Sequence, residues 1–567
     1  MKSLTPLNLS NWSRGINRSK SDIEIAPNEL YTAENCFVSN AMVKKRKGYT
    51  ELNTVALDTP DVISIYIYHK ENGEEFILCN CGTDVYHVAA DGSFSSIITG
   101  LTAGNVMSYA TINNLVYMSN GVNNVYHWNG IAAAGTAVPA LPKAKWLIVH
   151  GDKLFYIATA ANPNYVYFSQ AGTPETIDTD AYFEIYTDDG DILTGVASFV
   201  GILILFKNES IHILEGKTKA ELLLTSNLKN LHPRIGCVSA QSISYVPGGV
   251  MFLSDDGVQF TNSVNISKQS DNVSNFLNEI TFTYRQRSAA FWDGKNYRLS
   301  YVTGVNTRPN ESLVYEEYGI YNALGSKTEH VPWVLWTYGM NAYVVTKSGT
   351  IYAAGNDGFL YTIDSGTSDN GAEIVMKAIT GVFNFEAPYM TKIFRKAGIN
   401  LWRSVATVNW QISIDRGRAT FLKKFGSLTG LTYWGLNNWA ISSGTVTATN
   451  GFPTVVGDVD TDFTLVQAGD SFQVDGDAVS YIVDSVLAGT ITLKTNYTGI
   501  TGAGKTFVVW NDDTMFWTTP SSSYEQISLP KRLIGKNAQI QLLEASATAE
   551  VEIYATDLRF LPLEEGK

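Results

Sequence analysis

The stretch Glu74–Gly92 reads EEFILCNCGTDVYHVAADG and holds the pattern that decides the fold. It starts at a polar turn, runs through an apolar strand-like segment, and turns again into a second strand with aromatic and β-branched residues. The pattern recurs with one clear strand in Gly294–Val302 and with two in five other segments. These five are Asn113–Gly130, Gly151–Gly172, Gly201–Gly216, Gly248–Val264 and Ser348–Gly366. Successive segments start 39, 38, 50, 47, 46 and 54 residues apart.

A period of roughly 40 to 50 residues built only of strands predicts a β-propeller with one four-stranded blade per period. Seven recurrences within residues 51–365 predict six to eight blades. A β-sandwich also alternates strands and turns, but it does not have this spacing. The predicted fold class is therefore all-β.

The rest of the chain divides into an N-terminal arm, residues 1–50, and a split C-terminal part. Residues 366–425 and 515–567 contain long alternating strands, which predict the two halves of one antiparallel β-sandwich. Between them, residues 426–514 contain five short strand-like segments with Gly and Asp turns, which predict an inserted small β-barrel. The five segments are Asp462–Leu465, Gly469–Val474, Tyr481–Val486, Ile491–Lys494 and Thr506–Trp510.

The charge balance is acidic. The 567 residues include 54 Asp and Glu against 41 Lys and Arg, which gives a formal net charge of −13. A protein that grips nucleic acid by its phosphates normally presents a basic surface, because counterion release supplies much of the affinity. The composition argues against such a protein. It is compatible with a protein along which DNA passes without being bound.

Neither the N-terminal residues nor the longest apolar stretch predicts a membrane protein. Met1–Trp12 has no apolar core segment, so we expect no signal peptide. The longest apolar stretch, Ile192–Phe206, is too short for a membrane span and is interrupted by Thr, Gly and Ser residues. We therefore expect no membrane span.

One segment matches a phosphate-binding pattern. Gly499–Thr506 reads GITGAGKT, the form G-x4-G-K-[ST]. Such a loop requires a helix after it, whose N-terminal amides face the phosphates. The residues that follow, Phe507–Trp510, are aromatic and β-branched and predict a strand. We therefore interpret the segment as a hairpin turn.

Two acidic clusters could carry chemistry. One comprises Asp178, Asp180, Glu184, Asp188, Asp189 and Asp191, and the other comprises Asp458, Asp460 and Asp462. Paired carboxylates serve glycoside hydrolysis and alternating ones can bind Ca²⁺, but neither cluster contains the calcium-loop pattern. The favoured interpretation is that both clusters are solvated surface. A third interpretation, beside a chemical site and solvated surface, is that they line a negatively charged channel.

The motifs of several common enzyme classes are missing from the sequence. It contains no G-x-S-x-G elbow and no H-E-x-x-H segment. We expect no enzymatic activity, no catalytic residue, and no cofactor or metal site.

The N-terminal arm resembles a known family. Its segments are WSRGIN at Trp12–Asn17, APNEL at Ala26–Leu30, AENC at Ala33–Cys36 and VKKRKGY at Val43–Tyr49. They are similar to the GGIN entry, the P-N-E-L … A-x-N centre and the R/K-x-G-Y exit that lead into a propeller in tail nozzle proteins of short-tailed bacteriophages. This is the tail tubular protein B type, related to packaged-DNA stabilisation proteins. Arg14 replaces the first glycine of the entry motif.

The resemblance implies a structural virion protein. It would form a homo-oligomeric, hexameric ring below the head-to-tail connector or adaptor protein, with tail needle or fibre proteins nearby, and double-stranded DNA would pass through it transiently during ejection. The protein would be located in the phage tail after assembly in the host cytoplasm. The inserted barrel also resembles a small domain found in phage tail and connector proteins.

This role suggests two sets of functional residues. A docking arm would use polar and charged residues of the N-terminal segment, namely Arg14, Asn28, Glu29, Lys44, Lys45, Arg46 and Lys47. We expect that deletion of residues 1–45 blocks docking but leaves the propeller folded. An acidic lumen that repels phosphate would use the carboxylates Asp178, Asp180, Asp188, Asp189, Asp191, Asp458, Asp460 and Asp462.

An alternative is a tail-associated propeller that binds or depolymerises carbohydrate. Six tryptophans support it, namely Trp292, Trp333, Trp336, Trp402, Trp434 and Trp439. Packing inside the blades explains the same residues and is the favoured interpretation, because aromatic side chains dominate protein cores.

Overall fold

The structure is a computed structural model, and it consists of two units. The first comprises residues 1–426 and 525–567, and the second comprises residues 427–524. The residues that the structure describes are 5–38, 42–57, 61–185, 189–316, 332–385, 387–403, 408–425, 444–458, 461, 463, 466, 468, 470–475, 477, 479–510, 523–530, 533–548 and 550–562. Each unit is described by itself.

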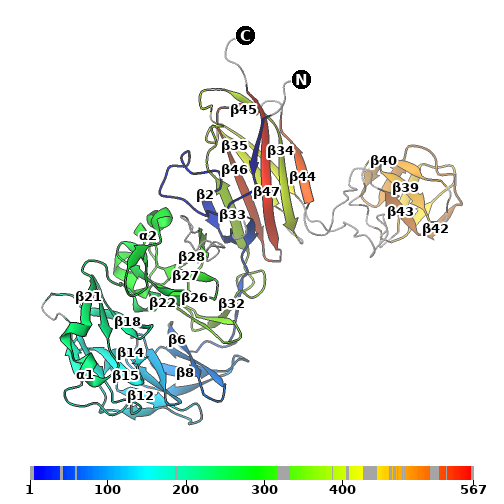
Figure 1. Cartoon of the computed structure of the whole chain (residues 1–567). Helices are drawn as coiled ribbons and strands as arrows, with labels where there is room; N and C mark the ends of the chain where they lie inside the picture. Colours follow the sequence, from blue (N-terminus) through cyan, green and yellow to red (C-terminus); the bar gives the residue numbers. More distant parts are fainter. Residues whose placement is uncertain are drawn as a thin grey trace. The chain divides into compact units, whose positions relative to one another are not determined.

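The first unit contains a β-propeller of seven four-stranded antiparallel blades, within the predicted range of six to eight. The predicted all-β class and the propeller are confirmed (Figure 1). Blades 1 to 3 are β6 (Val62–His69), β7 (Glu75–Cys81), β8 (Asp84–Val88) and β9 (Phe94–Ile98); β10 (Ser108–Ile112), β11 (Leu115–Ser119), β12 (Val125–Trp128) and β13 (Thr136–Val138); and β14 (Ala144–His150), β15 (Lys153–Thr159), β16 (Tyr165–Phe168) and β17 (Tyr182–Glu184).

Blades 4 and 5 carry short helices within, between and after them. Their strands are β18 (Leu193–Phe199), β19 (Ile202–Lys207), β20 (Ile211–Glu215) and β21 (Leu228–His232), followed by β22 (Ser244–Val246), β23 (Gly249–Ser254), β24 (Gly257–Thr261) and β25 (Ile266–Lys268). The helices of this region are α1 (Lys219–Leu222), η2 (Thr225–Asn227), η3 (Ala240–Ser242), η4 (Asp271–Val273), α2 (Ser274–Asn278) and η5 (Phe282–Arg287).

The N-terminal segment supplies the fourth strand of the last blade. Their strands are β26 (Ala289–Trp292), β27 (Asn296–Tyr301), β28 (Glu311–Glu316) and β29 (Trp333–Trp336), then β30 (Ala342–Val345), β31 (Ile351–Ala354), β32 (Leu360–Ile363) and β5 (Tyr49–Glu51). The outer strand of blade 7 is therefore β5, which pairs antiparallel with β32. This pairing links the start of the propeller segment to its end and covers the edge of β32, which closes the ring.

The sandwich consists of two sheets. One sheet has the order β3-β4-β47-β34-β44, with β1 on β47 and β45 on β34, and the other continues blade 6 through β2-β33-β46-β35-β36. Its strands are β1 (Thr5–Leu9), β2 (Leu30–Glu34), β3 (Cys36–Phe37), β4 (Val43–Lys45), β33 (Ile374–Thr380), β34 (Lys392–Arg403), β35 (Val408–Ile414), β36 (Ala419–Phe425), β44 (Ser523–Ser528), β45 (Ile534–Gly535), β46 (Ala538–Ser546) and β47 (Val551–Pro562). Trp410 of β35 donates from its indole nitrogen to Thr556 of β47 at 3.1 Å, so the two sheets face each other.

The N-terminal residues are not a separate arm. β1 pairs with β47, β4 pairs with β47, and β2 lies between β29 and β33 in the nine-stranded sheet. Figure 1 shows the blue N-terminal strands within the sandwich beside strands from the red end of the chain. Deletion of residues 1–45 would remove β2, the partner of the outer strand of blade 6, but would retain β5 and so all four strands of every blade. The expectation that the propeller stays folded without these residues stays a prediction.

The second unit is a seven-stranded half-barrel with the order β42-β37-β38-β41-β40-β39-β43. Its strands are β37 (Val446–Ala448), β38 (Thr454–Gly457), β39 (Ser471–Val474), β40 (Tyr481–Leu487), β41 (Thr490–Leu493), β42 (Gly502–Lys505) and β43 (Phe507–Trp510). It has its own apolar core, which includes Phe472, Val483 and Tyr497. The segment that mimics a phosphate loop forms β42, and β43 follows it directly. The two strands pair with β37 and β39 respectively, so the predicted strand is present but the predicted hairpin is not.

The buried face of the N-terminal segment gives a stability prediction. Trp12 is fully buried in the core that the propeller and the sandwich share. We expect Trp12→Ala to lower the free energy of unfolding by about 3–5 kcal/mol, because a large cavity replaces the ring. Urea unfolding of the full chain measures this. Ile131→Ala, at a position that is 79% exposed, is the control and should change stability by less than about 0.5 kcal/mol. Equal effects of the two substitutions would contradict a structural role of the N-terminal segment.

Candidate functional site: a polar joint between the propeller and the sandwich

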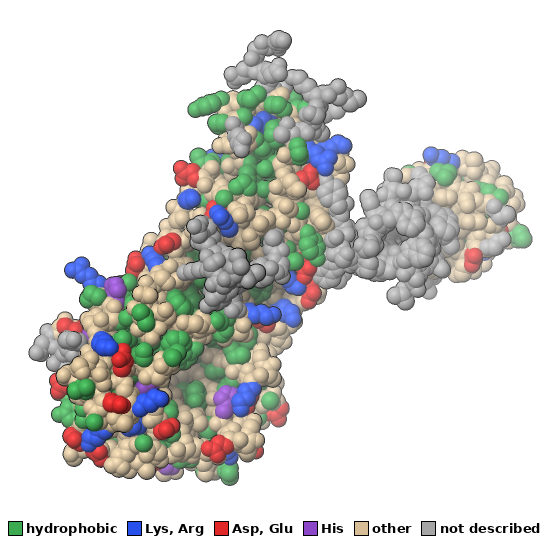
Figure 2. Space-filling model, viewed as in Figure 1, with side chains coloured by type: hydrophobic (Ala, Val, Ile, Leu, Met, Phe, Trp, Pro, Cys, Tyr) green, Lys and Arg blue, Asp and Glu red, His purple; other side chains and the backbone are tan. Residues whose placement is uncertain are grey.

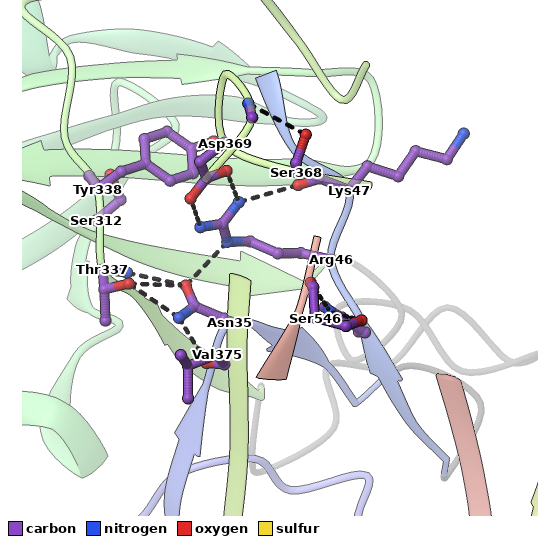
Figure 3. Close-up of polar contacts among 12 residues, drawn as sticks. Asn35, Arg46, Lys47, Ser312, Thr337, Tyr338, Ser368, Asp369, Val375 and Ser546 are labelled. Carbon is purple, nitrogen blue, oxygen red and sulfur yellow. Dashed lines mark hydrogen bonds and ion pairs between the residues drawn. The ribbon is translucent and has the colours of Figure 1, made fainter. Parts of the chain in front are cut away.

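Arg46 lies between β4 and β5, where the chain passes from the sandwich to the propeller, and its side chain has 0% exposure. Its two terminal nitrogens donate to the two carboxylate oxygens of Asp369 at 2.7 and 2.5 Å. Its Nε donates to the side-chain oxygen of Asn35 at 2.9 Å, and its guanidinium lies 4.6 Å from the ring centre of Tyr338. A bidentate pair of this kind fixes both distance and orientation. We call this group of contacts the polar joint (Figure 3).

Asn35 is the second centre of the polar joint. It occupies the left-handed region with φ 53°, which Asn tolerates better than most residues, and so turns the chain between β2 and β3. Its side-chain nitrogen donates to Thr337 Oγ1 at 2.9 Å and to the Val375 carbonyl at 2.8 Å. Its oxygen accepts from the Thr337 amide at 3.0 Å as well as from Arg46. One amide group therefore ties the end of blade 6, the sandwich strand β33 and the N-terminal segment together.

Lys45 adds a buried ion pair to the sandwich side of the polar joint. Its Nζ lies 2.5 Å from a carboxylate oxygen of Glu544 in β46 and 2.8 Å from the carbonyl of Ser546. The side chains of Lys45 and Glu544 are 2% and 0% exposed. Two charges buried this deeply stabilise the fold only as a pair, since removal of one leaves the other uncompensated.

Blades 6 and 7 are joined by a third buried cation, Arg298 of β27. It pairs with Asp293 at 2.5 Å and with Asp364 at 2.5 Å, and it lies 4.7 Å from the ring centre of Trp336. Burial alone would lower the pKa of Arg298, but the two carboxylates outweigh it and raise that pKa above its ordinary value. The group stays charged and holds the blades that flank the polar joint.

Two glycines allow the close backbone approach that the polar joint needs. Gly15 has φ +62°, and a Cβ there would lie 2.6 Å from the Trp333 carbonyl oxygen. A Cβ on Gly48 would lie 1.8 Å from the Ser368 carbonyl oxygen. Side chains at these two positions are excluded by backbone atoms that cannot move aside.

The proposed docking residues are engaged within the chain to different degrees. Arg46 and Lys45 are buried in the pairs described above, so the expectation that they contact a neighbour is corrected. Lys44 pairs with Glu552 at 2.6 Å and remains partly exposed, and Lys47 is exposed. A docking role for Lys44 and Lys47 stays a prediction.

The docking candidates that come first in the chain, Arg14, Asn28 and Glu29, lie at a local turn. Glu29 is buried and accepts a hydrogen bond from the Ala26 amide at 2.8 Å. The carbonyl of Asn28 accepts from the Arg14 amide at 3.3 Å. Arg14 and Asn28 are half-buried, while Glu29 shapes the turn from within and is not available to a partner.

The acidic residues of blade 3 do not form one cluster. Asp178 and Asp180 precede β17 and pair with Lys219 at 2.8 and 2.5 Å, and hydrogen bonds from Lys219 hold the pKa of both carboxyls below the ordinary value. Asp189 and Asp191 follow β17. Since the connections before and after an outer blade strand lie at opposite ends of the blade, the two pairs are separated. On the face that Figure 2 shows, acidic and basic side chains are interspersed.

Asp189 and Asp191 are also used inside the chain. Asp189 pairs with the buried Lys207 at 2.6 Å. Asp191 accepts hydrogen bonds from the amides of Asn208 and Glu209 at 2.9 and 3.0 Å and so shapes the turn between β19 and β20. Asp188 lies outside the described residues. A lumen role for these residues stays a prediction.

The second acidic group lies in the half-barrel. Asp458 accepts hydrogen bonds from Thr445 at 2.6 Å and Thr447 at 3.2 Å, and the first of these holds the pKa of its carboxyl below the ordinary value. Asp460 and Asp462 lie outside the described residues. The arrangement around Asp458 is that of a side chain that bridges strand ends.

A serine–histidine pair in blade 4 was not singled out from the sequence. Ser210 Oγ and His212 Nε2 are 3.1 Å apart, and both residues are buried. Burial, with the nearby cation of Lys207 as a smaller cause, lowers the pKa of His212 to about 4. Ser210 also donates to Asp191 at 3.4 Å, so the pair belongs to the same turn rather than to an accessible nucleophile.

The tryptophans proposed for sugar binding have different locations. Trp333 and Trp336 are buried in the shared core, and Trp292 is partly buried against it. The side chain of Trp402, and all of Trp434 and Trp439, lie outside what the structure describes. The buried pair cannot stack on a sugar.

Within the described ranges, no group of three or more His, Cys, Asp or Glu side chains is arranged to hold a metal ion. In the same part of the chain, no helix has the length and apolar character needed to cross a membrane.

Comparisons with known proteins give structural likeness only. No family model matches the chain, and no curated protein matches it. Among solved structures the chain is similar to a chain of the mitotic checkpoint complex, with TM-score 0.37, 12% identity, and coverage of 55% of this chain and 92% of that one. It is also similar to BamB from Moraxella catarrhalis (TM-score 0.33, 9% identity, 55% and 99% covered) and to the Neurospora crassa Pan2 WD40 domain (0.36, 8%, 57% and 97%).

The buried pair of the polar joint gives a mutational prediction. We expect Lys45→Met to lower the free energy of unfolding by about 3–5 kcal/mol, because Glu544 is left buried without its cation. The double variant Lys45→Met/Glu544→Leu should recover most of this loss. Urea unfolding of both variants measures the effect. Lys44→Met, at the neighbouring half-exposed pair, is the control and should cost about 0–1 kcal/mol. A Lys45→Met variant no less stable than Lys44→Met would contradict the burial of this pair.

The lowered pKa of His212 predicts a pH dependence. Between its ordinary value of 6.5 and about 4, the unfolded chain binds a proton that the folded protein does not bind. Stability therefore falls as the pH drops through this window, by on the order of 1–3 kcal/mol for this group. Relative to wild type, His212→Gln should lose less stability between pH 7 and pH 4.5 in urea unfolding. Parallel losses in the two proteins would show that His212 does not supply this dependence.

Proposed function

We propose that this chain is a structural virion protein of a short-tailed bacteriophage. It is the tail nozzle, it assembles as a homo-oligomeric ring of six copies below the head-to-tail connector, and double-stranded DNA passes through the ring at ejection. The protein acts as a conduit and not as an enzyme.

One observation carries the proposal. Two of the residues through which the sequence resembles the nozzle family, Asn35 and Arg46, form the centre of the polar joint. Asn35 ends the A-x-N segment, and Arg46 begins the segment that leads through Gly48 to Tyr49. Gly15 of the entry motif lies against Trp333 of blade 6. A motif of this kind is expected where a propeller and a split sandwich are joined by one N-terminal segment, so the resemblance and the architecture support each other.

The mechanics of the chain also support a conduit. Strands from the first 51 residues pair with blade 7, with the outer strand of blade 6 and with both sheets of the sandwich. A pull on the sandwich is therefore transmitted to several hydrogen-bonded ladders at once rather than to a single linker. Because the ring of blades is closed, few sheet edges are left unpaired, and this suits a particle under internal pressure.

The charge supports passage rather than binding. A net charge of −13 in each copy gives a ring an overall negative field, which repels phosphate. Each basic contact in a channel would instead add a salt-dependent hold on the DNA. Among the described tryptophans of the carbohydrate-binding alternative, Trp333 and Trp336 are buried and do not favour it.

Electron microscopy tests the proposal. We expect the purified full-length protein to form closed rings with an axial channel that is wide enough for a DNA duplex. Antibody labelling of virions of the source phage should mark the tail below the connector. Virions that carry no label would contradict the nozzle role. So would a protein that forms no ring at any concentration tested.

A further inference from the structure

A second feature lies on the propeller, at the loops that precede and follow the inner strands of blade 6. The helix η5 runs beside the loop of residues 303–308. The amide of Thr281 donates to the Val302 carbonyl at 2.9 Å, its hydroxyl donates to the Gly304 carbonyl at 3.2 Å, and Arg287 donates to the Thr307 carbonyl at 2.6 Å. These two segments present Phe282, Tyr284, Arg285, Arg287, Val305 and Arg308, which we call the Arg-aromatic patch.

The patch exposes large apolar side chains. Phe282 is 74% exposed and Val305 is 98% exposed. The hydrogen bonds at Thr281 place the two segments next to each other, so both exposed apolar side chains project from neighbouring backbone. Large apolar side chains exposed near one another are typical of a surface that another molecule covers.

Guanidinium groups surround this area. Arg285 lies 4.1 Å from the ring centre of Phe282, and Arg287 lies 4.7 Å from that of Tyr284. Arginine and aromatic residues are the types most enriched at the centres of protein interfaces, because they combine large area with directional hydrogen bonds. Stacking on the rings also holds the guanidiniums in place before any partner arrives.

The patch has one more cation than its local anions balance. Arg285 pairs with Asp255, and Arg308 pairs with Asp61. Within the described part of the chain, Arg287 forms no ion pair with a carboxylate. Burial, with the neighbouring Arg308 as a smaller cause, lowers the pKa of Arg287, while Tyr284 and Asp61 act in the opposite direction. A carboxylate from outside would balance the third cation of the patch.

We propose that the Arg-aromatic patch is the surface through which one copy of this chain contacts the next, with a carboxylate of the neighbour at Arg287 and apolar side chains of the neighbour over Phe282 and Val305. The proposal deepens the ring assembly proposed above and rests on it. A second copy fits because carboxylates are its commonest charged groups, 54 against 41 cations. Copies of equal charge repel at long range, so they require a local site of opposite sign and apolar character in order to associate.

A ring also needs the patch to meet a different surface of the neighbour. When one patch on every copy contacts a second, unlike patch on the next copy, the contact is repeated around an axis and closes. Two guanidinium–aromatic stacks, one of them formed by the Arg287 that lacks a carboxylate partner among the described residues, give the patch a basic and aromatic character. It therefore fits one half of such a contact.

Light scattering after size-exclusion chromatography tests the proposal on the full-length protein. We expect Phe282→Asp, Val305→Asp and Arg287→Glu each to weaken self-association at least about tenfold, because truncating or reversing an interface centre typically costs more than 1.4 kcal/mol. Ile131→Asp is the matched control, since Ile131 of blade 2 is 79% exposed and lies outside the patch. It should leave the oligomer unchanged. Thermal unfolding checks that every variant is folded.

The outcomes separate the patch from the proposed function. Rings that persist in the three folded patch variants would overturn the patch as the contact surface and leave the nozzle proposal intact. A wild-type protein that stays monomeric at all concentrations would overturn both. A labelled single-stranded oligonucleotide, titrated at low salt, tests the alternative that the patch binds nucleic acid. Binding that is lost in Arg287→Glu while the oligomer is unchanged would assign the patch to nucleic acid and overturn our proposal.

Discussion

The bidentate pair between Arg46 and Asp369 is the contact around which the first unit is organised. It lies where the N-terminal segment leaves the sandwich and enters blade 7, and Asn35 connects it to blade 6 and to β33. Because the guanidinium is buried, the pair tolerates little displacement of either partner. The orientation of the chain at this one point therefore determines whether β2 reaches its place between β29 and β33 and whether β5 reaches the edge of blade 7.

The propeller could be predicted from the sequence because its signals are local. Alternating strands and their turns recur at a regular spacing, and each blade is a meander of neighbouring strands that pair with one another. The role of residues 1–50 could not be predicted in the same way. Thr5 lies opposite Phe560 and Glu51 opposite Tyr361, and no local pattern names a strand partner hundreds of residues away.

The run Lys44–Lys47 shows a related limit. Four consecutive basic residues usually indicate a solvated segment, yet Lys45 and Arg46 point into the protein while Lys44 and Lys47 do not. The carboxylates that compensate these two buried cations, Glu544 and Asp369, are distant in sequence. The family-like motif contains Asn35 and Arg46, but it indicates neither their burial nor their partners. Conversely, the missing helix after Gly499–Thr506 was predictable, because the strand character of the next residues is local.

The pairing of β1 with β47 has a consequence for biosynthesis. β1 is translated long before its hydrogen-bonding partner β47, Val551–Pro562. The blade 7 strand β5 likewise waits for more than three hundred residues until β32 appears. Chains whose pairings span such sequence distances fold slowly, and their unpaired strand edges stay open in the meantime. The propeller can therefore close once β32 has been made, whereas the sandwich also needs β47. A chain that stops before β47 lacks the strand that pairs with β1, β4 and β34, so its sandwich stays incomplete.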